Sequence, residues 1–302
     1  MKIARDRDCR SAALLLSLWA LFLLSAVVIG WALDIDSRLT LNGNANRVME
    51  AEAMAASGSE IAMHPAVKPG SPLLRGGMSR TQTFEARITG EGGRLNLNWI
   101  VAGENPQRIE LLRRYLEVKG VELNDRDRMI DCLLDWVDPD NLVRLNGAEA
   151  EGDYQPTNTL LARIDDLKRV KAWEDFTGQT NWDAALTISS TGPVDLAWAP
   201  HDLLLALPGM TPEKVDAFLA FRRGADDIEG TEDDPEFKTI EEVRVALGFS
   251  PEQFKELAPL VGIKDQVVRV VSVGRSGGIA RTVQMVIRKA GNVPQLISWK
   301  EL

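Results

Sequence analysis

The sequence has very few of the side chains that build disulfide frameworks and histidine metal centres. Among 302 residues it contains two cysteines, Cys9 and Cys132, and two histidines, His64 and His201. The cysteines lie on opposite sides of a long apolar segment, so they cannot pair if that segment crosses a membrane. Neither histidine has a partner at metal-ligand spacing, and no H-E-x-x-H motif is present. The sequence therefore implies neither a disulfide scaffold nor a histidine zinc site.

The chain also has fewer basic than acidic side chains. The chain has 35 Lys and Arg against 44 Asp and Glu, which gives a net charge of −9 and a pI of about 5.0. A nucleic-acid binder needs a basic patch to neutralise phosphates, so the composition argues against that class of protein. It suits a protein that binds a cation. The length is enough for one or two domains with a proper core.

Charge is absent altogether from residues 12–33, A-A-L-L-L-S-L-W-A-L-F-L-L-S-A-V-V-I-G-W-A-L. A helix of about 22 residues spans roughly 33 Å, which is enough for a hydrocarbon core of about 30 Å. Four cations precede it, so we expect the leader in the cytoplasm and the remaining chain outside. A secretory signal peptide is the main alternative, but its apolar region is only about 7–15 residues long. We therefore predict a retained helix over residues 12–63, apolar first and amphipathic later.

The rest of the chain divides into strands, a helical block and strands again. Residues 64–80 are rich in Pro and Gly and indicate a linker. Residues 81–102 alternate apolar and polar side chains on both sides of a Gly-Gly turn, which predicts a strand, a turn and the start of a second strand. Residues 103–264 are helical in pattern, and residues 265–302 return to strands. We predict an α+β fold: a long N-terminal helix packed on a small antiparallel sheet, with a large all-α domain inserted between strands.

Three segments of the helical block look alike. They begin at Ile164, His201 and Ile240. In the second and third, a Gly ends a short helix pattern, and Thr-Pro-Glu or Ser-Pro-Glu opens the next one. Thr211 and Ser250 are favourable N-cap residues, and Pro suits the first helical position. The pattern predicts helix-hairpin-helix units.

Two stretches of this block concentrate carboxylates. The first is D-C-L-L-D-W-V-D-P-D, residues 131–140. Two carboxylates about 4 Å apart repel by roughly 4 kcal/mol at an effective dielectric constant near 20, so a cation nearby would be stabilising. Clustered hard oxygen ligands suit Ca²⁺. The EF-hand spacing is absent, however, and a solvated acidic turn explains the same residues.

The second acidic stretch covers residues 225–235, around a Gly that permits a sharp turn. A Ca²⁺ site and an exposed acidic linker both fit this segment. Its carboxylates are those of Asp227, Glu229, Asp233 and Asp234.

Four elements in order resemble the K-type minor pseudopilins of bacterial type II secretion systems. They are A-L-L-L-S-L-W-A-L in the apolar run, E-G-G-R-L-N-L-N at residues 91–98, D-W-V-D-P-D at residues 135–140, and G-A-E at residues 147–149 with the following Tyr154. The resemblance implies a pilin-like helix, a small sheet and a large helical insertion. It also implies a non-enzymatic role at the tip of a periplasmic filament that supports protein secretion, together with I- and J-type pseudopilins. The expected location is the bacterial inner membrane, crossed once, with the C-terminal domain in the periplasm.

The resemblance further implies calcium in the helical domain. The expected ligands are then Asp138, Asp140 and Glu149, with Asp135 at the hinge of the loop or behind the ligands.

A prepilin peptidase removes the basic leader of such proteins after a Gly, and methylation is also implied. The matching position here holds Ser11, so we expect cleavage between Ser11 and Ala12. The position that carries a Glu in most pilin-like helices then corresponds to Leu16. A subunit with no neighbour ahead of it has no use for that carboxylate, and a lipid-facing leucine is an equally good explanation.

Two other functions fit parts of the sequence less well. Helix-hairpin-helix units can bind phosphate at a helix N-terminus, and residues 207–212 are the best candidate for a membrane-anchored DNA-uptake protein. These units are acid-rich, which argues against DNA. A hydrolase that uses paired aspartates as acid and base is the other alternative, but the sequence pattern supplies no nucleophile–base pair. We therefore expect no enzyme activity.

Overall fold

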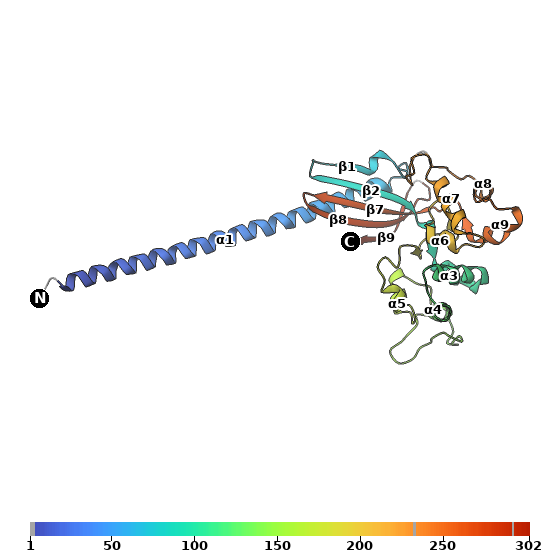
Figure 1. The fold of residues 1–302 in the computed structure, drawn as a ribbon, viewed down its shortest axis with the longest axis horizontal. Coiled ribbons are helices and arrows are strands. Elements are labelled where there is room, and N and C mark those ends of the chain that lie inside the picture. Colours follow the sequence, from blue (N-terminus) through green and yellow to red (C-terminus); the bar gives the residue numbers. More distant parts are fainter. Residues whose placement is uncertain (1–3, 232–233, 292) are drawn as a thin grey trace.

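The computed structural model of the chain describes residues 4–231, 234–291 and 293–302. Helix α1 (Ala4–Met63) has 60 residues, and its N-terminal part projects far from the rest of the molecule (Figure 1). Its large apolar side chains from Leu14 to Leu41 are exposed. The segment Leu14–Met63 is long and apolar enough to cross a membrane. Only the C-terminal part of α1 contributes to the folded core, where Ala51, Ala55 and Ala62 are completely buried.

The sheet that covers this part of α1 is antiparallel and has five strands. Its strands are β1 (Arg75–Gly77), β2 (Gln82–Gly90), β7 (Val267–Ser276), β8 (Ile279–Arg288) and β9 (Gln295–Glu301), in the order β1-β2-β7-β8-β9. Strands β2 and β7 pair from Gln82 with Ser276 to Gly90 with Val268. The chain thus leaves the sheet at the end of β2 and returns at the start of β7. The predicted fold class, a pilin-like helix on a small sheet with an insertion between strands, is confirmed.

The core between α1 and the sheet depends on a close approach of backbones. Gly274 of β7 lies against Ala51 and Ala55, and a Cβ at this glycine would be only 2.0 Å from the Ala51 carbonyl oxygen. Small residues on both sides therefore let the helix lie directly on the strand. The apolar side chains of this core are Ala62, Val67, Leu74, Ala86, Ile88, Val270, Met285 and Ile287.

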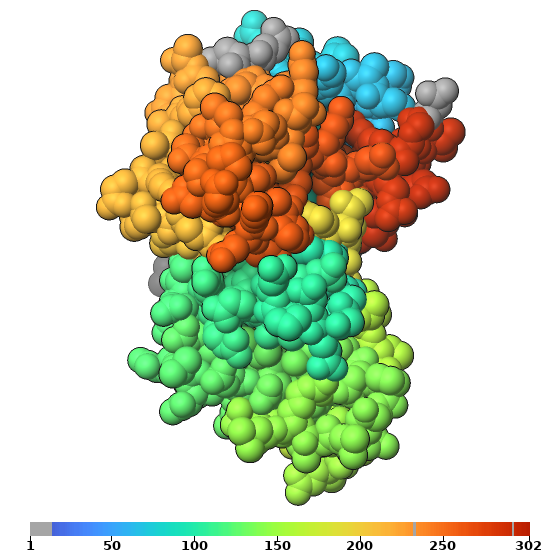
Figure 2. Space-filling model, turned by 90° about the vertical axis from the view of Figure 1, so that its right-hand side faces the viewer, coloured from blue at the N-terminus to red at the C-terminus, as the bar shows by residue number. Residues whose placement is uncertain are grey.

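The insertion is mainly helical and has its own larger core. Its elements are η2 (Glu91–Gly93), β3 (Leu95–Asn96), α2 (Leu97–Val101), η3 (Ala102–Glu104), α3 (Pro106–Val118), α4 (Leu123–Val137), η4 (Ile164–Arg169), α5 (Glu174–Thr177), β4 (Leu186–Thr187), β5 (Val194–Asp195), α6 (His201–Ala206), α7 (Pro212–Arg222), α8 (Ile240–Ala246), α9 (Pro251–Leu257), η5 (Ala258–Leu260) and β6 (Val261–Gly262). Figure 2 shows that α3, α4 and the loop after α4 form a lobe below the C-terminal helices.

The caps predicted for the helix-hairpin-helix units are confirmed. The hydroxyl of Thr211 accepts the backbone N–H of Lys214, and that of Ser250 accepts the N–H of Gln253. Helices α6 and α7 form one unit, and α8 and α9 form the other. The first of the three segments, from Ile164, does not form such a unit, because it consists of a 3-10 helix and a four-residue α-helix. Its sequence lacks the Gly-x-Thr-Pro or Gly-x-Ser-Pro turn of the other two segments, so no second helix of full length follows.

The prediction of a second strand of the main sheet within residues 81–102 is wrong. The strand after the turn, β3, contains only Leu95 and Asn96, and it pairs in parallel with β4 of the insertion rather than with the main sheet. Helix α2 begins directly afterwards, because the side chain of Asn96 accepts the backbone N–H of Trp99. Residues 64–80, predicted as a linker, also include η1 (Pro72–Leu74) and the edge strand β1.

A buried carboxylate joins the insertion to the sheet. Glu91 is completely buried and accepts two hydrogen bonds from Arg269 of β7, at 2.8 and 2.7 Å. Arg94 lies 3.3 Å from the same carboxylate, and the hydroxyl of Thr187 donates to it at 2.5 Å. The first residue of the insertion is therefore tied to both the sheet and a distant part of the insertion.

Candidate metal centre

The acidic stretch is positioned by helix α4. The apolar face of this helix, with Met129, Cys132, Leu133 and Trp136, is buried in the core of the insertion. Helix α4 ends at Val137, and Asp138 follows as its C-cap in an extended conformation. The loop after the helix then folds back over its last turn. As a result Asp135 is completely buried although it is charged.

Three carboxylates converge at this place. Oxygen atoms of Asp135, Asp138 and Glu149 all lie within 4.8 Å of one another. Both carboxylate oxygens of Glu149 and Oδ1 of Asp138 are inaccessible to solvent and have no hydrogen-bond partner among the described residues. Burial, followed by the charges of Asp135, Asp138 and Asp140, raises the pKa of Glu149 above its ordinary value. The structure thus leaves buried, uncompensated oxygen atoms at the centre of the cluster.

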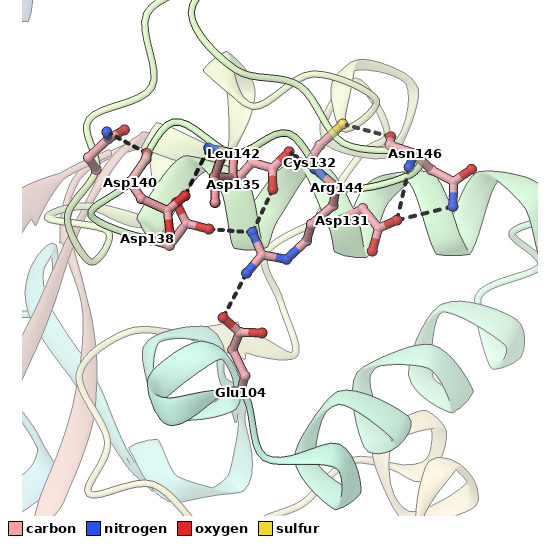
Figure 3. A network of polar contacts seen from close by, with 10 residues as sticks. Glu104, Asp131, Cys132, Asp135, Asp138, Asp140, Leu142, Arg144 and Asn146 are labelled. Atoms are coloured by element: carbon pink, nitrogen blue, oxygen red, sulfur yellow. Dashed lines mark hydrogen bonds and ion pairs between the residues drawn. The ribbon is translucent and has the colours of Figure 1, made fainter.

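One cation reaches the cluster from the loop (Figure 3). The Arg144 guanidinium donates from Nη1 to Oδ1 of Asp135 at 2.6 Å and to Oδ2 of Asp138. Its Nη2 donates to Oε1 of Glu104 at 2.6 Å. These three carboxylates raise the pKa of Arg144, so the guanidinium stays charged. The sequence reasoning did not identify Arg144. The only available signal was that it is the sole cation between Asp131 and Glu149.

The other two aspartates of the stretch shape the loop. Asp140 is exposed, and its Oδ1 accepts the backbone N–H of Leu142 at 2.8 Å. Oδ2 of Asp131 accepts the backbone and side-chain N–H groups of Asn146, at 3.1 and 3.0 Å. Of the three expected ligands, the structure brings Asp138 and Glu149 together and places Asp140 in a neighbouring turn. Asp135, which we expected at the hinge or behind the ligands, lies with Asp138 and Glu149 in the cluster.

The residues present fit a divalent cation that prefers oxygen ligands. The formal charges of the three converging carboxylates and of Arg144 are −3 and +1, which gives a formal charge of −2 at the cluster. Hard carboxylate oxygens are the ligands of Ca²⁺ and Mg²⁺. The unpartnered oxygens of Glu149 and Asp138 are buried, and no donor from the described residues reaches them. A bound divalent ion would both neutralise the cluster and satisfy these atoms.

The second acidic stretch has a different arrangement. Glu229 pairs with the buried Arg222 at 2.6 Å, and Asp227 pairs with Arg223 at 3.3 Å. Oδ2 of Asp234 accepts the backbone N–H groups of residues 230 and 231, at 2.5 and 3.3 Å. Asp233 lies outside the described residues. The three described carboxylates thus face arginines or their own loop, and a calcium site here stays a prediction.

Two further features predicted from the sequence are the thiol of Cys132 and the cleavage site of the leader. Cys132 is 1% exposed, and burial raises the pKa of its thiol to about 11, so it is an inert core residue. Ser11 and Ala12, the predicted cleavage site, lie within α1, and cleavage between them stays a prediction.

Comparisons with known proteins agree with this architecture. Residues 93–179, which contain α2 to α5 and the candidate metal centre, match the family described as "Type II secretion system (T2SS), protein K". Among solved structures, the fold is similar to a chain of the GspK–GspI–GspJ complex from the type 2 secretion system of enterotoxigenic Escherichia coli. That similarity has a TM-score of 0.59 at 14% identity, over 88% of this chain and 98% of that chain. No curated relative matches the chain in sequence.

Proposed function

We propose that this chain is a non-enzymatic tip subunit of the type II secretion pseudopilus and that it supports protein export across the outer membrane. The proposal is supported by the match of residues 93–179 to the protein K family and by the similarity of the fold to a chain of the GspK–GspI–GspJ complex. The resemblance predicted from the sequence is confirmed by the matched domain and the shared fold. Neither comparison favours the DNA-uptake alternative.

The observation that carries the proposal is the division of α1 into two parts. Its large apolar side chains from Leu14 to Leu41 are exposed, while Ala51, Ala55 and Ala62 are buried under the sheet. An uncovered apolar helix requires lipid, or the helices of sibling subunits, around it. We therefore assign it as the single inner-membrane anchor before assembly and as the packing element afterwards. The folded part then lies in the periplasm and the N-terminus in the cytoplasm.

The proposed partners are I- and J-type pseudopilins, because the similar solved chain belongs to a complex of K, I and J proteins. Leu16 is 71% exposed and offers no carboxylate to the amine of a neighbour ahead of it. The bulky insertion at the opposite end of the molecule from the membrane helix suits the end of a filament (Figure 1). The apolar Leu16 and the placement of the insertion both support a terminal rather than a repeating position.

Co-purification of the detergent-solubilised chain with its I- and J-type pseudopilins tests the assembly proposal. We expect both partners to be recovered with the wild type. Leu39→Glu, at a 66% exposed position of α1, should reduce recovery because it places a charge on the packing surface. Leu123→Glu, at a 56% exposed position of the insertion, is the matched control and should leave recovery unchanged. A monomer that is indifferent to both partners would refute the proposal.

We further propose that Asp135, Asp138 and Glu149 hold a Ca²⁺ ion, with Asp140 at the rim of the site. The ion supplies charge neutralisation and fixes the loop on α4. Calcium should therefore raise the melting temperature of the full chain in detergent, and a chelator should lower it. Glu149→Gln should abolish this response, whereas Glu151→Gln, whose side chain is 88% exposed, should retain it. No change in melting together with no bound ion by calorimetry would exclude calcium.

Processing by the prepilin peptidase is proposed between Ser11 and Ala12. The mass of the chain purified from cells that contain the peptidase should correspond to a start at Ala12. An intact leader in such cells would rule out cleavage at this site.

A further inference from the structure

Arg144 already occupies part of the space in which a metal ion would balance the acidic cluster. Its guanidinium is shared between Asp135 and Asp138, which belong to the candidate metal centre, and Glu104, which lies outside it (Figure 3). The Arg144 side chain is 22% exposed, while that of Asp135 is fully buried. The guanidinium is therefore the main compensation for a charge that has no contact with water.

The same contacts remove ligand atoms from the metal centre. Arg144 uses Oδ1 of Asp135 and Oδ2 of Asp138, and its backbone N–H donates to the other Asp135 oxygen at 3.2 Å. Of the carboxylate oxygens in this cluster, only Oδ1 of Asp138 and the two oxygens of Glu149 have no hydrogen-bond partner among the described residues. Ca²⁺ takes about six to eight oxygen ligands, so the free oxygens are too few as long as Arg144 keeps its bonds to Asp135 and Asp138. A guanidinium and a divalent ion a few ångströms apart also repel each other.

We infer that Arg144 is a resident counter-ion that competes with the divalent cation for Asp135 and Asp138, and that Glu104 retains the guanidinium when the cation binds. The inference rests on the metal site in the proposed function. Arg144 lowers the affinity for the ion and stabilises the cation-free insertion.

The surrounding loop is built to tolerate this exchange. Its neighbours on both sides are held independently, by the bonds from Leu142 to Asp140 and from Asn146 to Asp131. The Nη2–Glu104 bond needs no atom of the metal centre. The guanidinium can therefore leave Asp135 and Asp138 through a change of side-chain conformation, with the loop still attached to α4.

Calorimetric titration of CaCl₂ into the detergent-solubilised full chain tests the inference. Arg144→Gln should bind Ca²⁺ at least about tenfold more tightly than the wild type, because both competition and repulsion are removed. Arg114→Gln causes the same change of net charge on α3, at a 42% exposed arginine paired with Glu110, and should stay within about twofold of the wild type. Arg144→Lys keeps the charge without the forked geometry and should fall between the two.

Thermal melting supplies a second readout that does not depend on the binding constant. Without calcium, Arg144→Gln should melt below the wild type, since Asp135 loses its counter-ion. Saturating calcium should raise its melting temperature by more than that of the wild type. If calcium rescues the variant in this way, its fold is intact.

The possible outcomes separate the inference from the proposed function. Equal or weaker calcium binding by Arg144→Gln overturns the competition, because Arg144 would then act only as a support for the ligands. If Arg144→Gln binds calcium and the wild type does not, the competition is supported, but the proposed calcium site of the wild-type protein is refuted. An absence of binding in both proteins overturns the competition and the calcium site together. The co-purification with I- and J-type pseudopilins is unaffected in all three cases.

Discussion

Replacement of Glu91 should be among the most damaging single changes in the folded part of the chain. Glu91→Ala removes a completely buried carboxylate that faces Arg269 and Arg94, whose side chains are only 14% and 18% exposed. Two guanidinium groups are then left without their counter-ion, and Thr187 loses its acceptor. Breaking a buried ion pair from one side typically costs about 3–5 kcal/mol. Because both arginines retain some solvent contact, we expect a value near the lower end of that range.

The assay is thermal unfolding of the full chain in detergent, followed by tryptophan fluorescence. A loss of about 3 kcal/mol corresponds to a fall in melting temperature of roughly 6–12 °C, at about 2–4 °C per kcal/mol for a domain of this order of size. Glu85→Ala is the matched control, since Glu85 forms an exposed ion pair with Arg75 at 3.0 Å. Such surface pairs contribute about 0–1 kcal/mol, so its melting temperature should hardly change.

The double variant Glu91→Leu/Arg269→Met distinguishes the cost of an unpaired buried charge from the cost of lost side-chain packing. Replacing both members of a buried pair by apolar residues is often neutral, so the double variant should recover part of the loss. The reasoning is refuted if Glu91→Ala melts within about 2 °C of the wild type, or if Glu85→Ala is equally damaging.

Three further predictions concern other buried residues. Burial raises the folded-state pKa of Asp195 above its ordinary value, so the ionised carboxylate destabilises the fold at neutral pH, and this cost disappears as the pH falls through the folded-state pKa. The stability of Asp195→Asn relative to the wild type should therefore be more favourable at pH 7 than at pH 4, and an equal difference at both pH values would contradict this assignment. Gly274→Ala should destabilise the packing of α1 by about 1–3 kcal/mol in chemical denaturation, because its Cβ would overlap the Ala51 carbonyl, while Gly278→Ala, where the described residues leave open space, should be nearly neutral. In a Cys9→Ser background, Cys132 should react with a thiol reagent only after unfolding, since burial hides the thiol and raises its pKa to about 11; rapid labelling of this native chain would show that α4 opens.

Much of the framework follows from patterns that are local in sequence. The charge-free run at residues 12–33 gives the apolar part of α1, and the alternation in Phe84, Ala86 and Ile88 gives β2. Thr211 and Ser250 give the starts of α7 and α9. Each of these patterns depends on neighbouring residues within one helix turn or one strand, so no knowledge of distant contacts is needed.

The misread segments are those whose partners lie far away. Residues 95–99 alternate like a strand, but Asn96 caps a helix, and the buried sites for Leu95 and Leu97 belong to the insertion rather than the sheet. The partnership of Glu91 with Arg269 spans 178 residues, and no local periodicity announces it. Burial decided these cases, and burial depends on the whole fold.

The sequence by itself determined that a membrane-length helix leads into a strand–helix–strand chain whose acidic loops suit a cation. It did so because hydropathy, periodicity and charge are properties of adjacent residues. Only the tertiary structure decided which carboxylates meet. It brings Asp135, Asp138 and Glu149 together, turns Asp140 aside and sets Arg144 between two of them. The physical reason is that the end of α4 and the returning loop share one buried site, where charges must find partners that water cannot supply.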